Sequence, residues 1–135
     1  AILNAADGSL VCGDNFSMYT YQMEVPTDDE KGTILVTVNE AALILEAFKK
    51  GTVSSPSGLR LNKQKFQIVR FDEGEQTLYL KKPGGGACAV KTKKTIVFGS
   101  YNLSEFIKGS KESQTPGGTN AIVEKLAKIL KDASY

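Results

Sequence analysis

The sequence contains no histidine and no tryptophan, and only two of its 135 residues are cysteines. Without histidine, a serine or cysteine nucleophile would need a lysine or a carboxylate as its general base, and no motif nominates one. Cys12 and Cys88 lie far apart and complete no zinc-binding set, so we expect two reduced, buried thiols, with a single disulfide as the alternative. The sequence therefore predicts no metal, no cofactor and no enzymatic activity.

A strong charge of one sign and long hydrophobic runs are also missing. Seventeen basic and fifteen acidic side chains give a formal charge of +2, too small an excess to indicate nucleic acid as the main partner. No apolar run approaches the length of a membrane span, and the first residues lack the basic region of a signal peptide. We expect one domain over residues 1–135, cytoplasmic and monomeric by default for this size.

Turn residues divide the first part of the chain into two predicted hairpins and a helix. Asp7 and Gly8 separate two short apolar segments, which is a hairpin signal. Residues 17–38 alternate on both sides of a turn rich in Pro, Asp and Gly, and so predict a second hairpin. Residues 39–51 predict a helix capped by Asn39 and ended by Gly51. The tip of the second hairpin is acidic, and we interpret it as a solvated loop in preference to a metal site: Asp28, Asp29 and Glu30.

Residues 57–101 show imperfect alternation of polar and apolar side chains, which predicts a meander of four short antiparallel strands. The outward positions are mostly Lys, Arg, Gln and Thr, so we expect one exposed basic face that binds a protein. Residues 84–86 are glycines without the ending of a phosphate loop, and they predict a hairpin turn. A polar connection follows, and an apolar stripe opposed by lysines predicts a last helix at about 117–133. The fold class is therefore α+β, with an antiparallel sheet flanked by helices at about 39–50 and 117–133.

Several blocks of the sequence, in order and spacing, resemble profilins. They are Gly58–Leu61, Gln64–Phe66, Val69–Arg70, Lys81–Gly86, Val90–Thr92, Ile96–Gly99, Thr115–Gly117 and Val123–Leu126 with Asn120. The resemblance implies a profilin-like sheet, and it departs from the family in two respects. Profilins usually begin with a helix bearing Trp and Tyr, which we do not expect in this chain. The hairpin at about 17–38 is extra and resembles insertions in profilins of apicomplexan-type protists.

The resemblance implies a protein that binds monomeric actin and regulates filament assembly and nucleotide exchange on actin in the cytoskeleton. Carried over position by position, it nominates these actin-binding residues: Lys65, Ile68, Arg70, Lys81, Lys82, Gly117, Asn120 and Glu124. The alternative is that these lysines lie on solvent-exposed faces of the strands and form no binding site. A further hypothesis is that the acidic hairpin tip adds a contact to actin.

A second function, in another class, is binding to phosphoinositides on an anionic membrane surface. It would use basic residues beyond the actin set: Arg60, Lys63, Lys91, Lys93 and Lys94. Three of these, Lys91, Lys93 and Lys94, form a pattern that protects a strand edge as readily as it binds phosphate. Binding of proline-rich peptides is expected to be weak or absent, because the matching positions are mostly aliphatic: Ile129, Leu130 and Tyr135.

Overall fold

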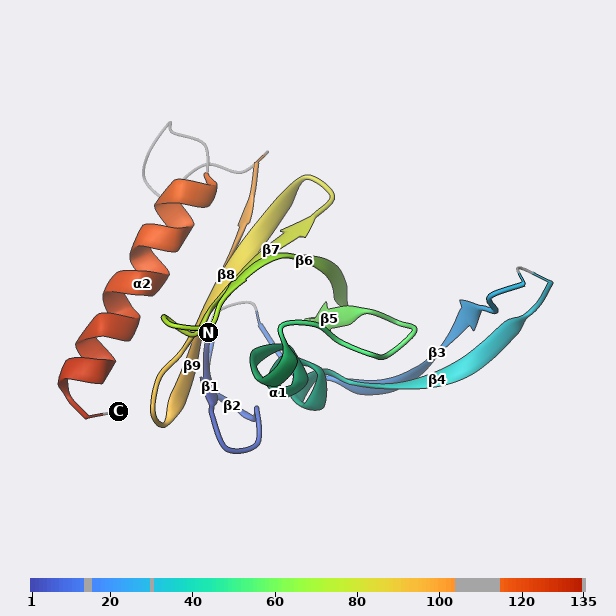
Figure 1. Cartoon of the computed structure of the whole chain (residues 1–135), viewed down its shortest axis with the longest axis horizontal. Coiled ribbons are helices and arrows are strands. Elements are labelled where there is room, and N and C mark those ends of the chain that lie inside the picture. The colour runs from blue at the N-terminus through green and yellow to red at the C-terminus, as the bar shows by residue number, and fades with distance from the viewer. Residues whose placement is uncertain (14–15, 30, 104–114, 135) are drawn as a thin grey trace.

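The computed structural model describes residues 1–13, 16–29, 31–103 and 115–134. Seven strands form one antiparallel sheet in the order β2-β1-β9-β8-β7-β6-β5, and two more form a separate ribbon (Figure 1). The elements are β1 (Ile2–Asn4), β2 (Leu10–Cys12), β3 (Thr20–Pro26), β4 (Thr33–Asn39), α1 (Glu40–Lys50), β5 (Leu59–Leu61), β6 (Gln64–Asp72), β7 (Thr77–Lys82), β8 (Gly85–Lys91), β9 (Thr95–Asn102) and α2 (Pro116–Asp132).

Both faces of the sheet are covered at its centre. Alternate residues of a strand point to opposite faces, so Leu78 and Leu80 join the core that includes α1, while Cys88 and Val90 pack against α2. Six of the seven residues of β8 are buried as a result. Figure 1 shows α2 lying along the sheet on the side away from α1. The exposed basic face predicted for the whole meander is therefore confined to the part of β6 and β7 that α2 leaves uncovered.

The meander contains five strands, so the prediction of four was wrong. The missed boundary is the turn between β5 and β6, where Asn62 and Lys63 have φ values of 53° and 60°. Two successive left-handed residues make the tightest hairpin turn, which usually selects Gly at the second position. Because this turn uses Lys in place of Gly, the sequence carried no strong turn signal there.

The extra hairpin is present as β3 and β4, which we call the arm (residues 20–39). Its seven cross-strand pairs run from Thr20 opposite Asn39 to Pro26 opposite Thr33. At its base, Tyr21, Met23 and Val38 pack on the core. The rest of the ribbon extends away from the sheet (Figure 1).

The two predicted helices are confirmed, as are the predicted caps Asn39 and Gly51 of the first. The Asn39 side chain accepts a hydrogen bond from the Ala42 N–H at 3.2 Å, and Gly51 ends α1 with a φ of 73°. The Thr115 hydroxyl accepts one from the Gly118 N–H at 3.0 Å, so α2 begins at Pro116. Neither described helix has the length and hydrophobicity needed to cross a membrane.

Candidate functional site

An aromatic side chain, Tyr79, links β6, β7 and α2 on the face that α2 covers in part. The register places Arg70 of β6 opposite Tyr79, and the guanidinium carbon lies 5.6 Å from the centre of the Tyr79 ring. The Tyr79 hydroxyl donates a hydrogen bond to Glu124 of α2 at 3.1 Å. Burial first, and then the hydrogen bond and charge of Glu124, raise the pKa of Tyr79. The phenol therefore stays protonated and keeps donating at physiological pH.

The cation beside Tyr79 is accessible to a partner. The side chain of Arg70 is 67% exposed and lies 3.6 Å from a carboxylate oxygen of Asp72. Lys81 is exposed on the neighbouring strand, opposite Gln67. We call the surface formed by Arg70, Tyr79, Lys81 and Glu124 the Tyr79 face. It presents two cations around a half-buried aromatic ring and a carboxylate.

A β-bulge adds an apolar side chain next to this face. The pairing of β6 with β7 shifts between Ile68 and Arg70, and the extra residue, Val69, is 62% exposed. A bulge bends its strand and re-aims the side chains that follow it. Here the bulge leaves Val69 exposed at the position directly before Arg70 in the chain.

The structure brings five of the eight predicted actin-binding residues to this region. Arg70, Lys81 and Glu124 belong to the Tyr79 face, while Asn120 and Gly117 lie four and seven residues before Glu124 on α2. Lys65 is exposed near the start of β6, two residues before Gln67.

Ile68 and Lys82 are not brought to the Tyr79 face. Ile68 packs against the core that includes α1. Lys82 is only 8% exposed, and its ammonium group donates to the Gln64 side chain at 2.9 Å and lies 5.9 Å from the centre of the Phe66 ring. Neighbouring residues of a strand point to opposite faces, so Lys81 and Lys82 could not both face the same partner.

Two residues of this region, Tyr79 and Val69, were missed in the sequence. Tyr79 lies between Leu78 and Leu80, and strict alternation of that segment already placed it on the face opposite the core. The signal for Val69 was the pair of consecutive apolar residues Ile68 and Val69, which breaks the two-residue period and is typical of a bulge or a strand end.

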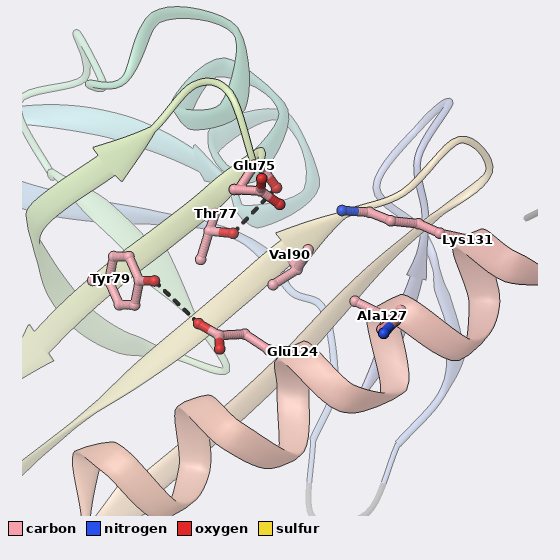
Figure 2. Close-up of a pocket in the computed structure, with 8 residues that line it drawn as sticks. Glu75, Thr77, Tyr79, Val90, Glu124, Ala127 and Lys131 are labelled. Atoms are coloured by element: carbon pink, nitrogen blue, oxygen red, sulfur yellow. Dashed lines mark hydrogen bonds between the residues drawn. The ribbon is translucent and has the colours of Figure 1, made fainter.

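A pocket of about 490 Å³ adjoins the Tyr79 face between α2 and the strands β7 and β8 (Figure 2). Val90 and Ala127 supply its apolar side, and the Thr77 hydroxyl beside them donates to the Glu75 carbonyl at 3.2 Å. The charged residues that line it are Glu75, Glu124, Lys128 and Lys131. The pocket therefore combines apolar side chains with two carboxylates and two ammonium groups.

The buried thiol beneath α2 is chemically protected. Cys88 has no exposed surface, and burial, with a smaller effect of Glu124, raises its pKa to about 12. Cys12 is exposed on β2, so the expectation that both thiols are buried was wrong for that residue. It lies on a three-residue strand at the edge of the sheet.

The two thiols should therefore react at very different rates. At pH 8 we expect an aromatic disulfide reagent to modify one thiol per chain, because the thiolate is the reactive form and Cys88 is both protonated and inaccessible. The second equivalent should react only after unfolding in urea. In a Cys12→Ser variant the fast reaction should disappear. Rapid modification of both thiols in the folded protein would contradict the burial of Cys88.

The residues proposed for phosphoinositide binding fall into two groups. Arg60 lies in β5 and Lys63 in the turn between β5 and β6. Arg60 donates to the Ser57 carbonyl at 3.2 Å, and the Lys63 ammonium lies 4.6 Å from the centre of the Tyr19 ring. Lys91, Lys93 and Lys94 lie around the turn between β8 and β9. The strand registers place these two turns at opposite ends of the sheet, so the five residues do not form one cluster.

The structure describes two of the three residues named for proline-rich peptides. Ile129 is 55% exposed on α2, whereas Leu130 is half-buried against the cluster around Cys88. Tyr135 lies outside the described residues. The described positions offer aliphatic side chains and no aromatic wall.

An antiparallel sheet covered by a helix on each face, with an exposed face of cations around Tyr79, defines a class of small binding proteins. The family model described as Profilin matches residues 1–135, and the chain belongs to the profilin family.

The comparisons extend to individual relatives and structures. A profilin of Tetrahymena pyriformis is 34% identical over 140 residues, covering 99% of this chain and 86% of that protein. Profilin-A of Physarum polycephalum is 31% identical over 96 residues, which are 71% of this chain and 68% of the relative. Among solved structures, Acanthamoeba castellanii profilin II superposes with a TM-score of 0.67 at 24% identity, covering 100% of this chain and 85% of that one.

Proposed function

We propose that this profilin binds monomeric actin through the Tyr79 face and acts by binding alone. The observation that carries the proposal is the link from Arg70 through Tyr79 to Glu124, which holds side chains of two strands and a helix on one accessible surface. Family membership supplies the identity of the partner, since profilins as a family bind actin. Asn120, Gly117 and Lys65 extend the proposed surface along α2 and β6.

The chemistry of the face supports a partner with an acidic, partly apolar surface. Exposed Val69 supplies apolar contact next to the cations Arg70 and Lys81. Apolar contacts contribute most of the affinity at such interfaces, whereas rim charges set orientation and association rate. A protein partner therefore accounts for both kinds of side chain, while a free anion would use only the cations.

Binding at one end of the actin monomer would block its addition at one filament end and permit it at the other. Faster nucleotide exchange would follow if the bound profilin favoured a more open actin conformation, because a ligand shifts an equilibrium by its differential affinity for the two states. The proposed site of action is the cytoplasm, at the actin cytoskeleton.

A charge reversal at Arg70 tests this proposal. We expect the unmodified protein to slow spontaneous assembly of pyrene-labelled actin, and Arg70→Glu to weaken actin binding about tenfold or more, since like charges would then meet the acidic partner. The matched control is Lys93→Glu, which makes the same charge change at the exposed turn between β8 and β9.

The control should retain the activity of the unmodified protein. Equal loss in both variants would mean that net charge, and not the Tyr79 face, determines binding. Failure of the unmodified protein to slow assembly, together with salt-sensitive binding to vesicles containing phosphoinositides, would favour the membrane function instead.

A further inference from the structure

The outer edge of β4 is an unusually open strand edge. The ribbon contains two strands, and no third strand of the described chain pairs with it. Residues 33–39 read Thr-Ile-Leu-Val-Thr-Val-Asn, with no charge, proline or glycine. Such a segment is rich in residues that favour strands, and an uncovered edge of this kind is a template for pairing with another chain.

The other strand edges carry features that discourage such pairing. β2 and β5, at the two edges of the large sheet, are three residues long. The outer edge of β3 contains a charge at Glu24 and lacks a backbone donor at Pro26. Short edges, charges and prolines are the usual means by which proteins prevent edge-to-edge association. Among the described edge strands, β4 alone is long and contains neither a charge nor a proline.

The exposed side chains of β4 lie on both faces of the ribbon. Met23 pairs with Val36, and Val25 pairs with Ile34, so one face of the ribbon is apolar. The part of this face at the base of the arm packs on the core, and the apolar face extends beyond that base toward the tip. Ile34 is 46% exposed there. On the other face Leu35 pairs with Glu24 and is 63% exposed. The strand therefore exposes an apolar side chain on each side of its open edge.

We propose that the β4 edge binds β4 of a second copy of this chain, antiparallel and centred on Leu35. Directly opposed residues of an antiparallel pair lie on the same face of the sheet. The residues of β4 on its apolar face have even numbers, so this face stays continuous only if even-numbered residues of one copy lie opposite even-numbered residues of the other. Centring on Leu35 does this. It places Ile34 opposite Val36 of the second copy, and Leu35 opposite its own equivalent.

This register fits the charges and the shape of the arm. An antiparallel pair directs the two acidic tips, which carry Asp28 and Asp29, in opposite directions, so they do not repel each other across the interface. The paired residues 33–37 carry no charge. Because the arm extends away from the sheet (Figure 1), the strands of the large sheet do not cover this edge. The result is a four-stranded sheet with two-fold symmetry, in the order β3-β4-β4-β3.

Sedimentation of the full chain over a range of concentrations tests the association. The contact is small, so we expect reversible dimers with a dissociation constant on the order of 100 μM. Leu35→Lys should weaken dimerisation at least about tenfold, because two like charges would lie directly opposite each other. The matched control is Gln22→Lys, which adds the same charge on the same face of the ribbon but on β3. A monomer at all concentrations, or equal dimerisation of both variants, would overturn the proposal.

A disulfide test reports the register itself and does not depend on a stable dimer. In a Cys12→Ser background, Leu35→Cys would place two thiols opposite each other, where the Cα separation of about 4.5–5.5 Å in an antiparallel pair permits a disulfide. Mild oxidation should then produce a covalent dimer several-fold faster than for Gln22→Cys in the same background. Equal rates for the two variants would exclude the proposed pairing.

Discussion

Replacement of Glu40 by alanine is expected to lower the free energy of unfolding by about 4 kcal/mol, since it would leave three partly buried backbone N–H donors without their acceptor. The Glu40 residue has no exposed surface although it lies in the first turn of α1. One carboxylate oxygen accepts hydrogen bonds from the N–H groups of Tyr19 at 3.0 Å and Asn62 at 2.9 Å. The other accepts from the Lys63 N–H at 2.8 Å. Glu40 therefore joins the base of the arm to the turn between β5 and β6.

Two further variants separate the role of the carboxylate from a general effect of mutation in α1. Glu40→Gln keeps one carbonyl oxygen for two of the donors but turns its NH2 group toward the third. We therefore expect it to lower the free energy of unfolding by about half as much as Glu40→Ala does. Glu46→Ala, also in α1, removes an acceptor for the Ser54 N–H and hydroxyl at a solvent-accessible position, and its effect should be much smaller. Urea unfolding followed by circular dichroism measures all three. A loss for Glu40→Ala no larger than for Glu46→Ala would contradict this role.

The elements with local signals were predicted well from the sequence. Asn39 and Gly51 mark the ends of α1, and both act as caps in the structure. Asp7 and Gly8 mark the turn between β1 and β2, where Gly8 has a φ of 73° and an ideal Cβ would lie 2.7 Å from the Ala41 carbonyl oxygen. These features depend on the conformations of a few neighbouring residues, so a single segment of sequence contains the information that specifies them.

Features that depend on distant contacts were not predictable in the same way. A glutamate in the first turn of a helix usually indicates a solvated charge at the helix dipole, yet Glu40 is buried by segments twenty or more residues away. The cover that α2 provides for β8 likewise comes from a helix far along the chain. Amphipathic patterns show that each element buries one face, but they do not show which element it faces.

The candidate site shows the same division. The resemblance to profilins nominated Arg70, Lys81 and Glu124, and the structure places them around Tyr79. The hydrogen bond between Tyr79 and Glu124 joins residues 45 positions apart, which no periodicity could reveal. The position of Lys82 could have been anticipated from strand alternation alone, because its neighbour Lys81 faces outward.

Gly99 controls how closely α2 approaches the sheet, and its replacement by alanine should cost about 2 kcal/mol of stability, as overpacking does. An ideal Cβ on Gly99 would lie 2.6 Å from a methyl carbon of Val123 and 3.4 Å from that of Thr119. The helix would have to move outward, which would lengthen the contact between Tyr79 and Glu124 and weaken the proposed binding of actin. Thermal unfolding and the pyrene-actin assay measure the two effects. Gly32→Ala is the matched control for the thermal unfolding, since its Cβ would meet nothing within 4 Å.

A second substitution shows whether the contact with Val123 is the cause. Val123 is 3% exposed, so Val123→Ala alone should cost about 2 kcal/mol through lost burial. In the double variant the new methyl group on residue 99 would occupy part of the space that the valine leaves. We therefore expect the double variant to be more stable than the sum of the single effects by about 1 kcal/mol or more, which is a typical coupling for residues in contact. Additive losses would mean that α2 is positioned by its other contacts with β8 and β9, and that Gly99 does not set the distance between α2 and the Tyr79 face.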